Sequence, residues 1–432
     1  MKDQLRNIFL DVLDELSLER VLQERLSCRD GVLVAGETRI DLAEYKKILT
    51  VAIGKAAGPM AKGFARLVQP RKASGVIVAP TPTPDAPPYF MTYVGGHPYP
   101  TEGSVYAASV VEEMLTDLRE QHLVVCLLSG GGSAICEKPV SDEISFEDLR
   151  EFFRVLVTCG ADIVAMNILR KHFSAIKGGR LAERAHPARQ LTLYVSDVPP
   201  EQPSTVASGP TMPDESTLAD CRATVERLGI RERLPASIRA MLDEDRVPET
   251  PKPGDAVFAN SSWHCLLDNA DAIEAVRRRC EALGWTVETD LSVDDLPVPE
   301  AADRLLARLK ALRESVAEGP VAVLTGGELS SPVLGDGRGG RNSAFVLDCV
   351  SKIDGRPIAV ISAGTDGVDG NSPAAGALAD GDSLRKAREA GLDPDECRQR
   401  SDAYSFFDRL GDALETGPTG NNVRDIRLLV AW

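Results

Sequence analysis

The segment with the clearest chemical potential places Gly130, Gly131 and Gly132 in a row between Ser129 and Ser133. Glycine has no Cβ atom, so it tolerates positive φ angles and lets a ligand come close to the backbone. The N–H groups of such a loop can turn together towards a phosphate or a carboxylate, and a helix beginning near Ser133 would add its positive end. The pattern predicts an anion-binding loop, and a tight strand-to-helix turn without a ligand is the alternative.

Three cations stand where they could complete such a site. Lys55 follows an apolar run at a predicted loop-to-helix junction. On a 3.6-residue period, Arg170, Ser174 and Lys177 share one face of a helix predicted over residues 167–180. Two cations and a hydroxyl on one face suit an anionic ligand. The alternatives are a solvated lysine and an exposed basic stripe.

Two carboxylates follow apolar runs that we predict to be strands. Asp197 comes after residues 191–196 and precedes two prolines, which prevent a helix from continuing. Ligands of open α/β sheets bind beyond the carboxyl ends of the strands, so Asp197 is predicted to be a general base or a magnesium ligand. Asp366 ends a similar run, with turn formation as the competing explanation.

The C-terminal part repeats the pattern of an apolar run followed by glycine. One run leads into Gly326, Gly327 and Glu328, and Arg341 ends a second glycine-dense loop. Asn260 follows a short run that resembles the end of a strand. We expect all five residues to contribute to the ligand site.

Familiar motifs account for little of this pattern. Gly335, Gly337 and Gly340 match Gly-x-Gly-x-x-Gly, but the preceding Ser-Ser-Pro argues against the strand that a dinucleotide fingerprint requires. A serine-hydrolase elbow around Ser133 would need glycine where Ile135 stands. The glycine loops, cations and carboxylates are together the parts that phosphoryl transfer needs, which favours a phosphate-handling enzyme.

Composition narrows the classes of partner. The 432 residues include 65 acidic and 49 basic ones, for a net charge of −16, so no general attraction to nucleic acid or to anionic membranes is expected. No apolar run approaches the roughly 20 residues of a membrane helix. Nine cysteines form no Cys-x-x-Cys pair, which is typical of core residues in a reducing cytoplasm.

The elements that must position these residues are strands and helices in alternation. Residues 5–26 carry apolar positions at helical spacing, and the runs before Lys55 and Asp197 are predicted strands. Residues 245–255 contain three prolines and no periodicity. We therefore predict a domain over residues 1–248 and a second region over 249–432.

The motifs also resemble one known family over most of the chain. Val-Ala-Ile-Gly-Lys55-Ala, Leu-Ser-Gly-Gly-Gly-Ser133, Ser-Asp197-Val, Gly-Arg-Gly-Gly-Arg341-Asn and Gly-Thr-Asp366-Gly-x-Asp-Gly are similar to segments of the glycerate 2-kinases that end in a MOFRL domain. The resemblance implies a large Rossmann-like N-terminal domain with a parallel sheet and a smaller C-terminal α/β domain. It also implies an active site in the cleft between them.

The resemblance further implies an activity. ATP, with Mg²⁺, would phosphorylate D-glycerate on its 2-hydroxyl group, and Lys55, Asp197 and Arg341 would be the central catalytic residues. We ourselves expect the substrate and the nucleotide to be bound by residues 129–133 and 326–328 together with Arg170, Lys177, Asn260 and Asp366. The oligomeric state is left open, with a homodimer as one option.

Two other functions are weighed against the kinase. One is an NAD(P)H-dependent reductase of hydroxypyruvate, which would need the nicotinamide site that the misplaced glycine motif does not support. The other is a sensor that binds sugar phosphates without turnover. It is allowed by departures from the family pattern, such as Ser343-Ala344 where Gln-Glu is expected after Arg341-Asn342.

Overall fold

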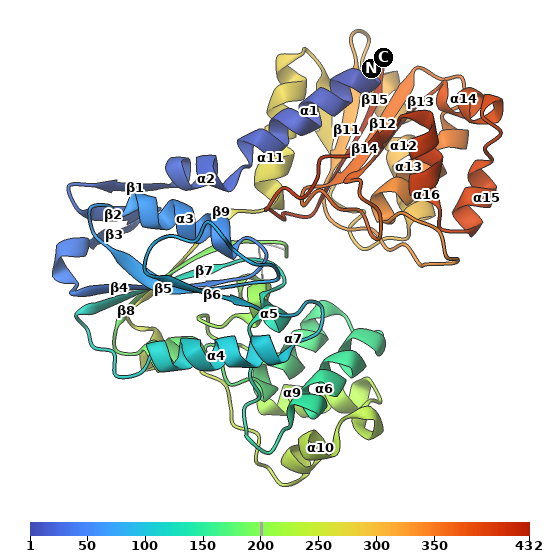
Figure 1. Cartoon of the computed structure of the whole chain (residues 1–432). Coiled ribbons are helices and arrows are strands. Elements are labelled where there is room, and N and C mark those ends of the chain that lie inside the picture. The colour runs from blue at the N-terminus through green and yellow to red at the C-terminus, as the bar shows by residue number, and fades with distance from the viewer. Residues whose placement is uncertain (199–201) are drawn as a thin grey trace. The chain divides into compact units, whose positions relative to one another are not determined.

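The computed structural model describes residues 1–198 and 202–432 (Figure 1). Backbone contacts divide the chain into two units. The first unit is Leu18–Leu266, and the second unit combines Met1–Ser17 with Leu267–Trp432. Each unit has its own six-stranded sheet.

The sheet of the first unit has the strand order β6-β5-β4-β7-β8-β9. Its strands are β4 (Lys47–Ile53), β5 (Ala73–Ala79), β6 (Phe90–Val94), β7 (His122–Leu128), β8 (Arg189–Val195) and β9 (Ser261–Leu267). The strands from β6 to β8 are parallel to their neighbours. The order of the strands reverses between β4 and β7, and such a switch point is where open α/β sheets bind ligands.

Helices on both faces protect this sheet. Helix α3 (Ala57–Leu67) covers one face and α4 (Glu102–Met114) covers the other (Figure 1). Strands that are buried on both faces need continuous apolar sequence, and the residues of β4 and β7 from Val51 and Leu123 onwards are buried. A predicted α/β fold with a parallel sheet is thus confirmed.

A helical layer adjoins the sheet in the same unit. It consists of α6 (Phe146–Thr158), α7 (Ile163–Phe173), α9 (Leu218–Arg227) and α10 (Ala236–Asp243), whose core includes Phe152, Phe153 and Phe173. The smaller elements are α2 (Leu18–Arg25), α5 (Gly132–Ile135), α8 (Arg180–Ala185) and the antiparallel sheet of β1 (Leu26–Arg29), β2 (Val32–Ala35) and β3 (Thr38–Asp41).

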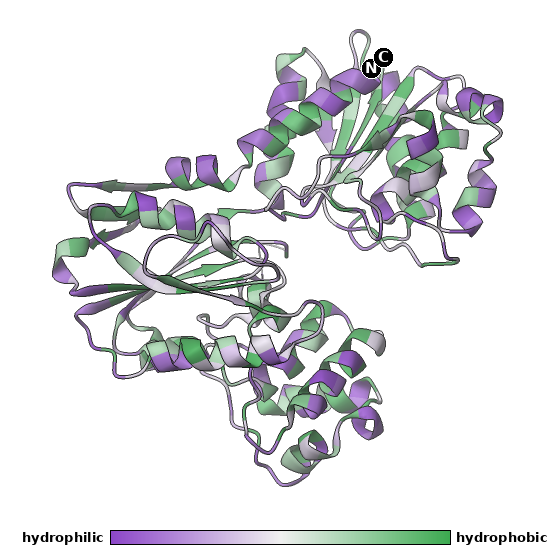
Figure 2. Cartoon of the chain, in the orientation of Figure 1, coloured by the Kyte–Doolittle hydropathy of each residue, from purple (hydrophilic) through white to green (hydrophobic). Residues whose placement is uncertain are grey.

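The sheet of the second unit has the order β10-β11-β15-β12-β13-β14 and is mostly antiparallel. Its strands, largely hydrophobic in Figure 2, are β10 (Thr286–Thr289), β11 (Val321–Thr325), β12 (Ile358–Gly364), β13 (Gly376–Asp380), β14 (Ala413–Leu414) and β15 (Asp425–Ala431). Its helices are α1 (Lys2–Glu15), α11 (Asn269–Ala282), α12 (Val298–Ser315), α13 (Arg341–Lys352), α14 (Ser383–Glu389), α15 (Pro394–Gln399) and α16 (Ala403–Leu410). The predicted second α/β domain is therefore present.

The boundary between the two units differs from the one that the prolines predict. The first unit ends at Leu266, whereas the predicted boundary lies between residues 248 and 249. Residues 249–266 lie in the first unit, because β9 pairs beside β8. The predicted helix over residues 5–26 is two helices, α1 and α2, that fall in different units. Helix α1 belongs to the second unit, where Asn421 Nδ2 donates a 2.8 Å hydrogen bond to the carbonyl of Leu16.

The helix predicted over residues 167–180 is wrong in its second half. Helix α7 ends at Phe173, and Ser174 is extended with φ −106° and ψ 140°. The Ser174 hydroxyl accepts hydrogen bonds from the amides of Ile176 and Lys177, both at 3.2 Å. Serine side chains compete with helical hydrogen bonds in this way, so Lys177 does not share a helix face with Arg170.

Candidate functional site

The loops that follow β4 and β7 are joined at the switch point of the first sheet. The amide of Ser129 donates to the carbonyl of Ile53, and the amide of Lys55 donates to the carbonyl of Gly130, both at 3.0 Å. The Ser129 hydroxyl accepts a third hydrogen bond, also 3.0 Å, from the amide of Ala56. Ser129, which is buried, is therefore a structural link that fixes Lys55 beside the glycines.

The first glycine loop, Ser129–Ser133, presents its backbone N–H groups without internal acceptors. Among the residues that the structure describes, none accepts a hydrogen bond from the amides of Gly130, Gly131, Gly132 or Ser133. Gly131 has a φ of 80°, which a residue with a side chain would adopt only under strain. Buried N–H groups need an acceptor, so these four are suited to a bound anion.

Helix α5 contributes less to this loop than predicted. A helix does begin at Gly132, next to the predicted start, but it has only four residues. A single turn has too few aligned peptide dipoles to act as a positive helix end. The anion-binding capacity of the loop therefore comes from its own amides.

Asp197 lies against this loop, two residues beyond the end of β8. A Cβ atom built on Gly130 would fall 2.1 Å from Asp197 Oδ2, so glycine is required there for the carboxylate to approach. The structure thus brings Lys55, Gly130 and Asp197 together at the carboxyl ends of adjacent strands, as the sequence predicts.

Positive side chains surround the loop. Lys177 is fully buried, and its Nζ donates a 2.9 Å hydrogen bond to the carbonyl of Gly132. His97 lies on Gly131, where an added Cβ atom would meet the imidazole at 3.1 Å. Desolvation lowers the pKa of His97, and the charges of Lys55 and Arg170 lower it further. Lys55, Arg170 and Lys177 therefore bring three basic side chains near the loop in a protein whose net charge is negative.

Glu137 is a buried carboxyl group behind the loop. It accepts hydrogen bonds from the Ser174 hydroxyl at 2.5 Å and from the amide of Lys138 at 2.8 Å. Burial raises its pKa to about 7, although Lys177 and these hydrogen bonds act in the opposite direction. Glu137 was not predicted as a site residue, because an isolated Glu in the sequence does not show that its side chain is enclosed.

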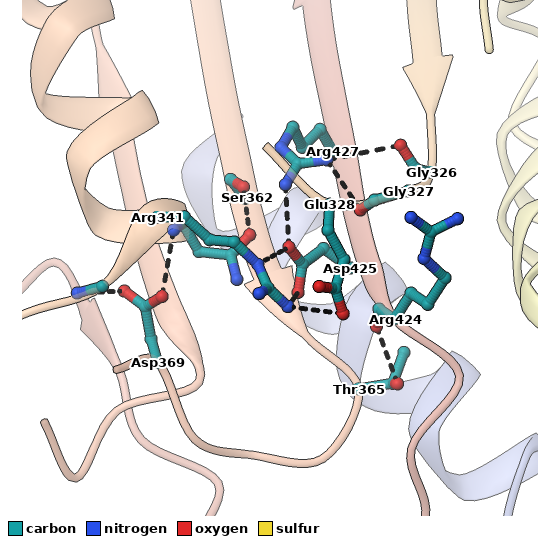
Figure 3. Close-up of polar contacts among 12 residues, drawn as sticks. Gly326, Gly327, Glu328, Arg341, Ser362, Thr365, Asp369, Arg424, Asp425 and Arg427 are labelled. Atoms are coloured by element: carbon teal, nitrogen blue, oxygen red, sulfur yellow. Dashed lines mark hydrogen bonds and ion pairs between the residues drawn. The ribbon is translucent and has the colours of Figure 1, made fainter. Parts of the chain in front are cut away.

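In the second unit, Arg341 is held by two carboxylates (Figure 3). Its Nε and Nη2 donate to Asp425 at 2.6 and 3.2 Å, and Nη2 pairs with Glu328 at 2.9 Å. Burial disfavours its charge, but the negative charges of Asp425 and Glu328 raise its pKa above the ordinary value. Arg341 is therefore a fixed cation whose side chain is about 34% exposed.

Asp425 and Arg427 form the buried support of Arg341. Arg427 Nη2 donates to Asp425 Oδ2 at 2.8 Å, and neither side chain is more than 1% exposed. Despite burial, which acts in the opposite direction, Arg427 and Arg341 lower the pKa of Asp425. Both residues were missed in the sequence, although charges at alternate positions of a buried apolar strand are a usable signal.

The second glycine loop, Gly326–Glu328, differs from the first because its polar groups are used internally. The amide of Gly327 donates to Asn269 Oδ1 at 3.1 Å, and the amide of Glu328 donates to Asp294 Oδ1 at 2.8 Å. Arg427 Nη1 donates to the carbonyls of Gly326 and Gly327 at 3.3 and 3.1 Å. These amides therefore have protein acceptors instead of facing a ligand.

Asp369 and Asp366, two further carboxylates of the second unit, accept hydrogen bonds from backbone amides. Asp369 caps α13, accepting from the amides of Asn342 and Ser343 at 2.9 and 2.8 Å and from the Ser343 hydroxyl at 2.6 Å. The serine that departs from the family pattern is thus part of this cap. Asp366 Oδ1 accepts from the amide of Val368 at 3.1 Å, as the competing turn interpretation predicts.

The predicted site residues therefore fall into three groups. Lys55, Asp197, Arg170, Lys177 and the first glycine loop are in the first unit. Arg341, Asp366 and the second glycine loop are in the second unit. Asn260 precedes β9, and its carbonyl accepts from Gln190 near the start of β8, so it lies at the other edge of the sheet from Gly130.

Comparisons with known proteins agree with this architecture. Residues 4–243 match the domain of unknown function DUF4147, and residues 321–425 match the MOFRL family. The D-glycerate 2-kinase of Thermotoga maritima is 33% identical over 428 residues, which cover 98% of both chains. A putative hydroxypyruvate reductase of Agrobacterium vitis is 36% identical over 89% of this chain and 87% of its own.

Solved structures give the same result. The crystal structure of the Thermotoga maritima glycerate kinase has a TM-score of 0.85 and 30% identity, covering 100% of this chain and 99% of its own. A Pyrococcus horikoshii protein has a TM-score of 0.80 and 29% identity, with 99% and 98% covered. The architecture is that of a two-domain α/β enzyme. The chain belongs to the glycerate kinase family with DUF4147 and MOFRL domains, which confirms the resemblance.

None of the helices in the described ranges 1–198 and 202–432 is both long and apolar enough to cross a membrane. Within the same ranges, no three His, Cys, Asp or Glu side chains are grouped so that they could hold a metal ion by themselves.

Proposed function

We propose that the protein transfers the γ-phosphoryl group of ATP to the 2-hydroxyl group of D-glycerate, giving 2-phospho-D-glycerate. The observation that carries the proposal is the first glycine loop, between Lys55 and Asp197, whose four N–H groups have no acceptor among the described residues. The relatives named glycerate kinase support the choice of substrate. Nine free cysteines support a place in the reducing cytoplasm.

The residues have distinct tasks in this reaction. Amides of the first glycine loop would hold phosphate oxygens, while Lys55 and Arg341 would offset charge on the phosphoryl group during transfer. Asp197 would accept the proton of the attacking hydroxyl group or hold magnesium. We therefore propose that the reaction needs Lys55 and Asp197 from one unit and Arg341 from the other.

Asp197 fits magnesium only as one ligand among several. Mg²⁺ in kinases is bound by one or two carboxylates together with substrate phosphates, instead of by a cage of protein ligands. Bound there, Mg²⁺ would neutralise charge on the phosphates.

A coupled assay of ADP release tests the proposal. The full chain with ATP, Mg²⁺ and D-glycerate should release ADP, and phosphorus NMR of the product should show a phosphate ester on carbon 2. A parallel reaction with NADH and hydroxypyruvate should leave nicotinamide absorbance unchanged. Glycerate binding without ADP release would indicate a sensor, and NADH consumption would indicate a reductase; either would overturn the proposal.

A further inference from the structure

Arg170 is a cation of α7 that makes no hydrogen bond or ion pair with the described residues, although the negative charge of Glu137 acts on it. Among the described residues, none accepts a hydrogen bond from its guanidinium, and its buried Nε has no partner. The Arg170 guanidinium carbon lies over the ring of Phe153, 5.0 Å from the centroid. A buried N–H donor without an acceptor is costly, so the Nε group of Arg170 calls for an acceptor such as an anion.

A second unpaired donor lies one helical turn away. Asn167 and Arg170 are three residues apart in α7 and so share a face of the helix. Asn167 is 4% exposed, and its Nδ2 has no hydrogen-bond partner among the described residues. The pair therefore offers a charged and a neutral donor side by side.

A chain of hydroxyl groups connects Asn167 to the first glycine loop. The Ser208 hydroxyl donates to Asn167 Oδ1 at 2.7 Å, which leaves its oxygen to accept from the Ser133 hydroxyl at 2.8 Å. Since the carboxamide oxygen is held by this chain, its NH₂ group must point elsewhere. Ser133 is also the last residue with an unpaired amide in the loop.

We propose that Arg170 and Asn167 form the subsite for the carboxylate of the acceptor. This inference rests on the proposed function and adds the part of the substrate that each group recognises. One planar guanidinium with a neutral donor beside it matches a singly charged carboxylate, while the row of amides next to Lys55 matches phosphate. In a 2-hydroxy acid, the carbon that bears the hydroxyl group is bonded directly to the carboxylate. A carboxylate held beside Ser133 would therefore bring the 2-hydroxyl group to the loop.

Exchange of Arg170 tests the subsite. Arg170→Gln removes the charge and keeps a side chain that can lie on Phe153. It should raise KM for D-glycerate by about 30-fold or more and change KM for ATP by less than about threefold, since a charge-assisted bidentate pair is lost. The matched control is Arg154→Gln, because Arg154 is an exposed arginine of α6 paired with Glu151. The control should behave like the unaltered chain.

A neutral substrate analogue separates charge recognition from general damage. The unaltered chain should prefer D-glycerate to glyceramide strongly, and Arg170→Gln should reduce that preference to near parity. Asn167→Asp provides a second variant, because it keeps the acceptor for Ser208 but turns the unpaired donor into an acceptor that repels a carboxylate. Thermal unfolding of each variant identifies one that does not fold, and the other then decides.

The outcomes distinguish this subsite from the proposed function. If glycerate is phosphorylated but neither variant changes KM for glycerate, the subsite is refuted and the kinase stands. If no phosphorylation occurs, calorimetry with D-glycerate and with lactate decides. Binding that is lost in Arg170→Gln supports the subsite without the kinase, whereas no binding, or equal binding by both proteins, overturns it. A selective rise in KM for ATP would assign Arg170 to the nucleotide and also refute the subsite.

Discussion

The two glycine loops follow apolar strands and look alike in the sequence, yet they differ in what their amides do. In the first loop, none of the described residues accepts from the amides of Gly130 to Ser133. In the second, Asn269 and Asp294 accept from the amides of Gly327 and Glu328. Glycine after a strand therefore permits an anion site, but the presence of internal acceptors decides whether one exists.

The acceptors of the second loop give it a different task. Asn269 also donates to the carbonyls of Val423 and Asp425 at 2.7 and 3.2 Å. Arg427 bonds to the loop carbonyls and to Asp425, which in turn holds Arg341. The second loop therefore fixes a cation in place, whereas the first offers donors directly to a ligand.

The largest expected effect concerns two cations, one in each unit. Lys55→Ala and Arg341→Ala should each lower kcat by roughly 10²–10³-fold, because each removes a charge that offsets the transferred phosphoryl group. Lys62→Ala, at a lysine of α3 whose side chain is 44% exposed and pairs with Asp85, should leave kcat unchanged. Steady-state ADP release measures all three, and near-normal turnover in Lys55→Ala or Arg341→Ala would refute its assignment.

Adding one methyl group to each loop sharpens the comparison. In Gly130→Ala the new Cβ atom would lie 2.1 Å from Asp197 Oδ2, so the carboxylate must move and kcat should fall by about 10²-fold. In Gly326→Ala it would lie 1.8 Å from Asn269 Oδ1, and overpacking should cost about 1–3 kcal/mol of stability. Paired kinetics and urea unfolding measure both; the reverse pattern would contradict the distinction between the loops.

Removing an acceptor from the second loop makes it more like the first. Asn269→Ala leaves the Gly327 amide and two carbonyls without partners, which should lower the free energy of unfolding by about 2–3 kcal/mol. KM for ATP should not improve, because the freed amide does not face a ligand. Tighter ATP binding in this variant would show that the loop is a nucleotide site that Asn269 blocks.

The last expected effect is a pH dependence behind the first loop. Because the pKa of Glu137 rises to about 7 from 4.5, the folded protein holds this proton more tightly than the unfolded chain does. The carboxyl group's contribution to stability is complete below pH 4.5 and is lost as pH rises through about 7. The loss is roughly 3 kcal/mol.

Glu137→Gln should therefore gain stability relative to the unaltered chain between pH 5 and pH 8 in urea unfolding. The exposed Glu147→Gln in α6 should show no such change. A constant difference across this range for Glu137→Gln would mean that the buried carboxyl group does not titrate there.

Sequence patterns predicted the functional residues at the ends of strands, but not the residues that hydrogen-bond to a loop from distant parts of the sequence. Lys55 and Asp197 were predictable because parallel strands place their carboxyl ends at one edge of a sheet. The acceptors Asn269 and Asp294 were not, because they reach Gly327 and Glu328 across 58 and 34 residues of sequence. Helical periodicity also predicted that α7 continues past Phe173. The prediction was wrong because periodicity takes no account of the hydrogen bonds that the Ser174 side chain accepts.

Amide hydrogen exchange tests the difference between the loops most directly. Full-length protein is compared alone and with Mg²⁺ and a non-hydrolysable ATP analogue, and peptides covering residues 129–135 and 326–329 are followed by mass spectrometry. The account predicts fast exchange in the first peptide that slows on nucleotide binding, and slow exchange in the second that does not change. Protection that appears only in the second peptide would contradict it.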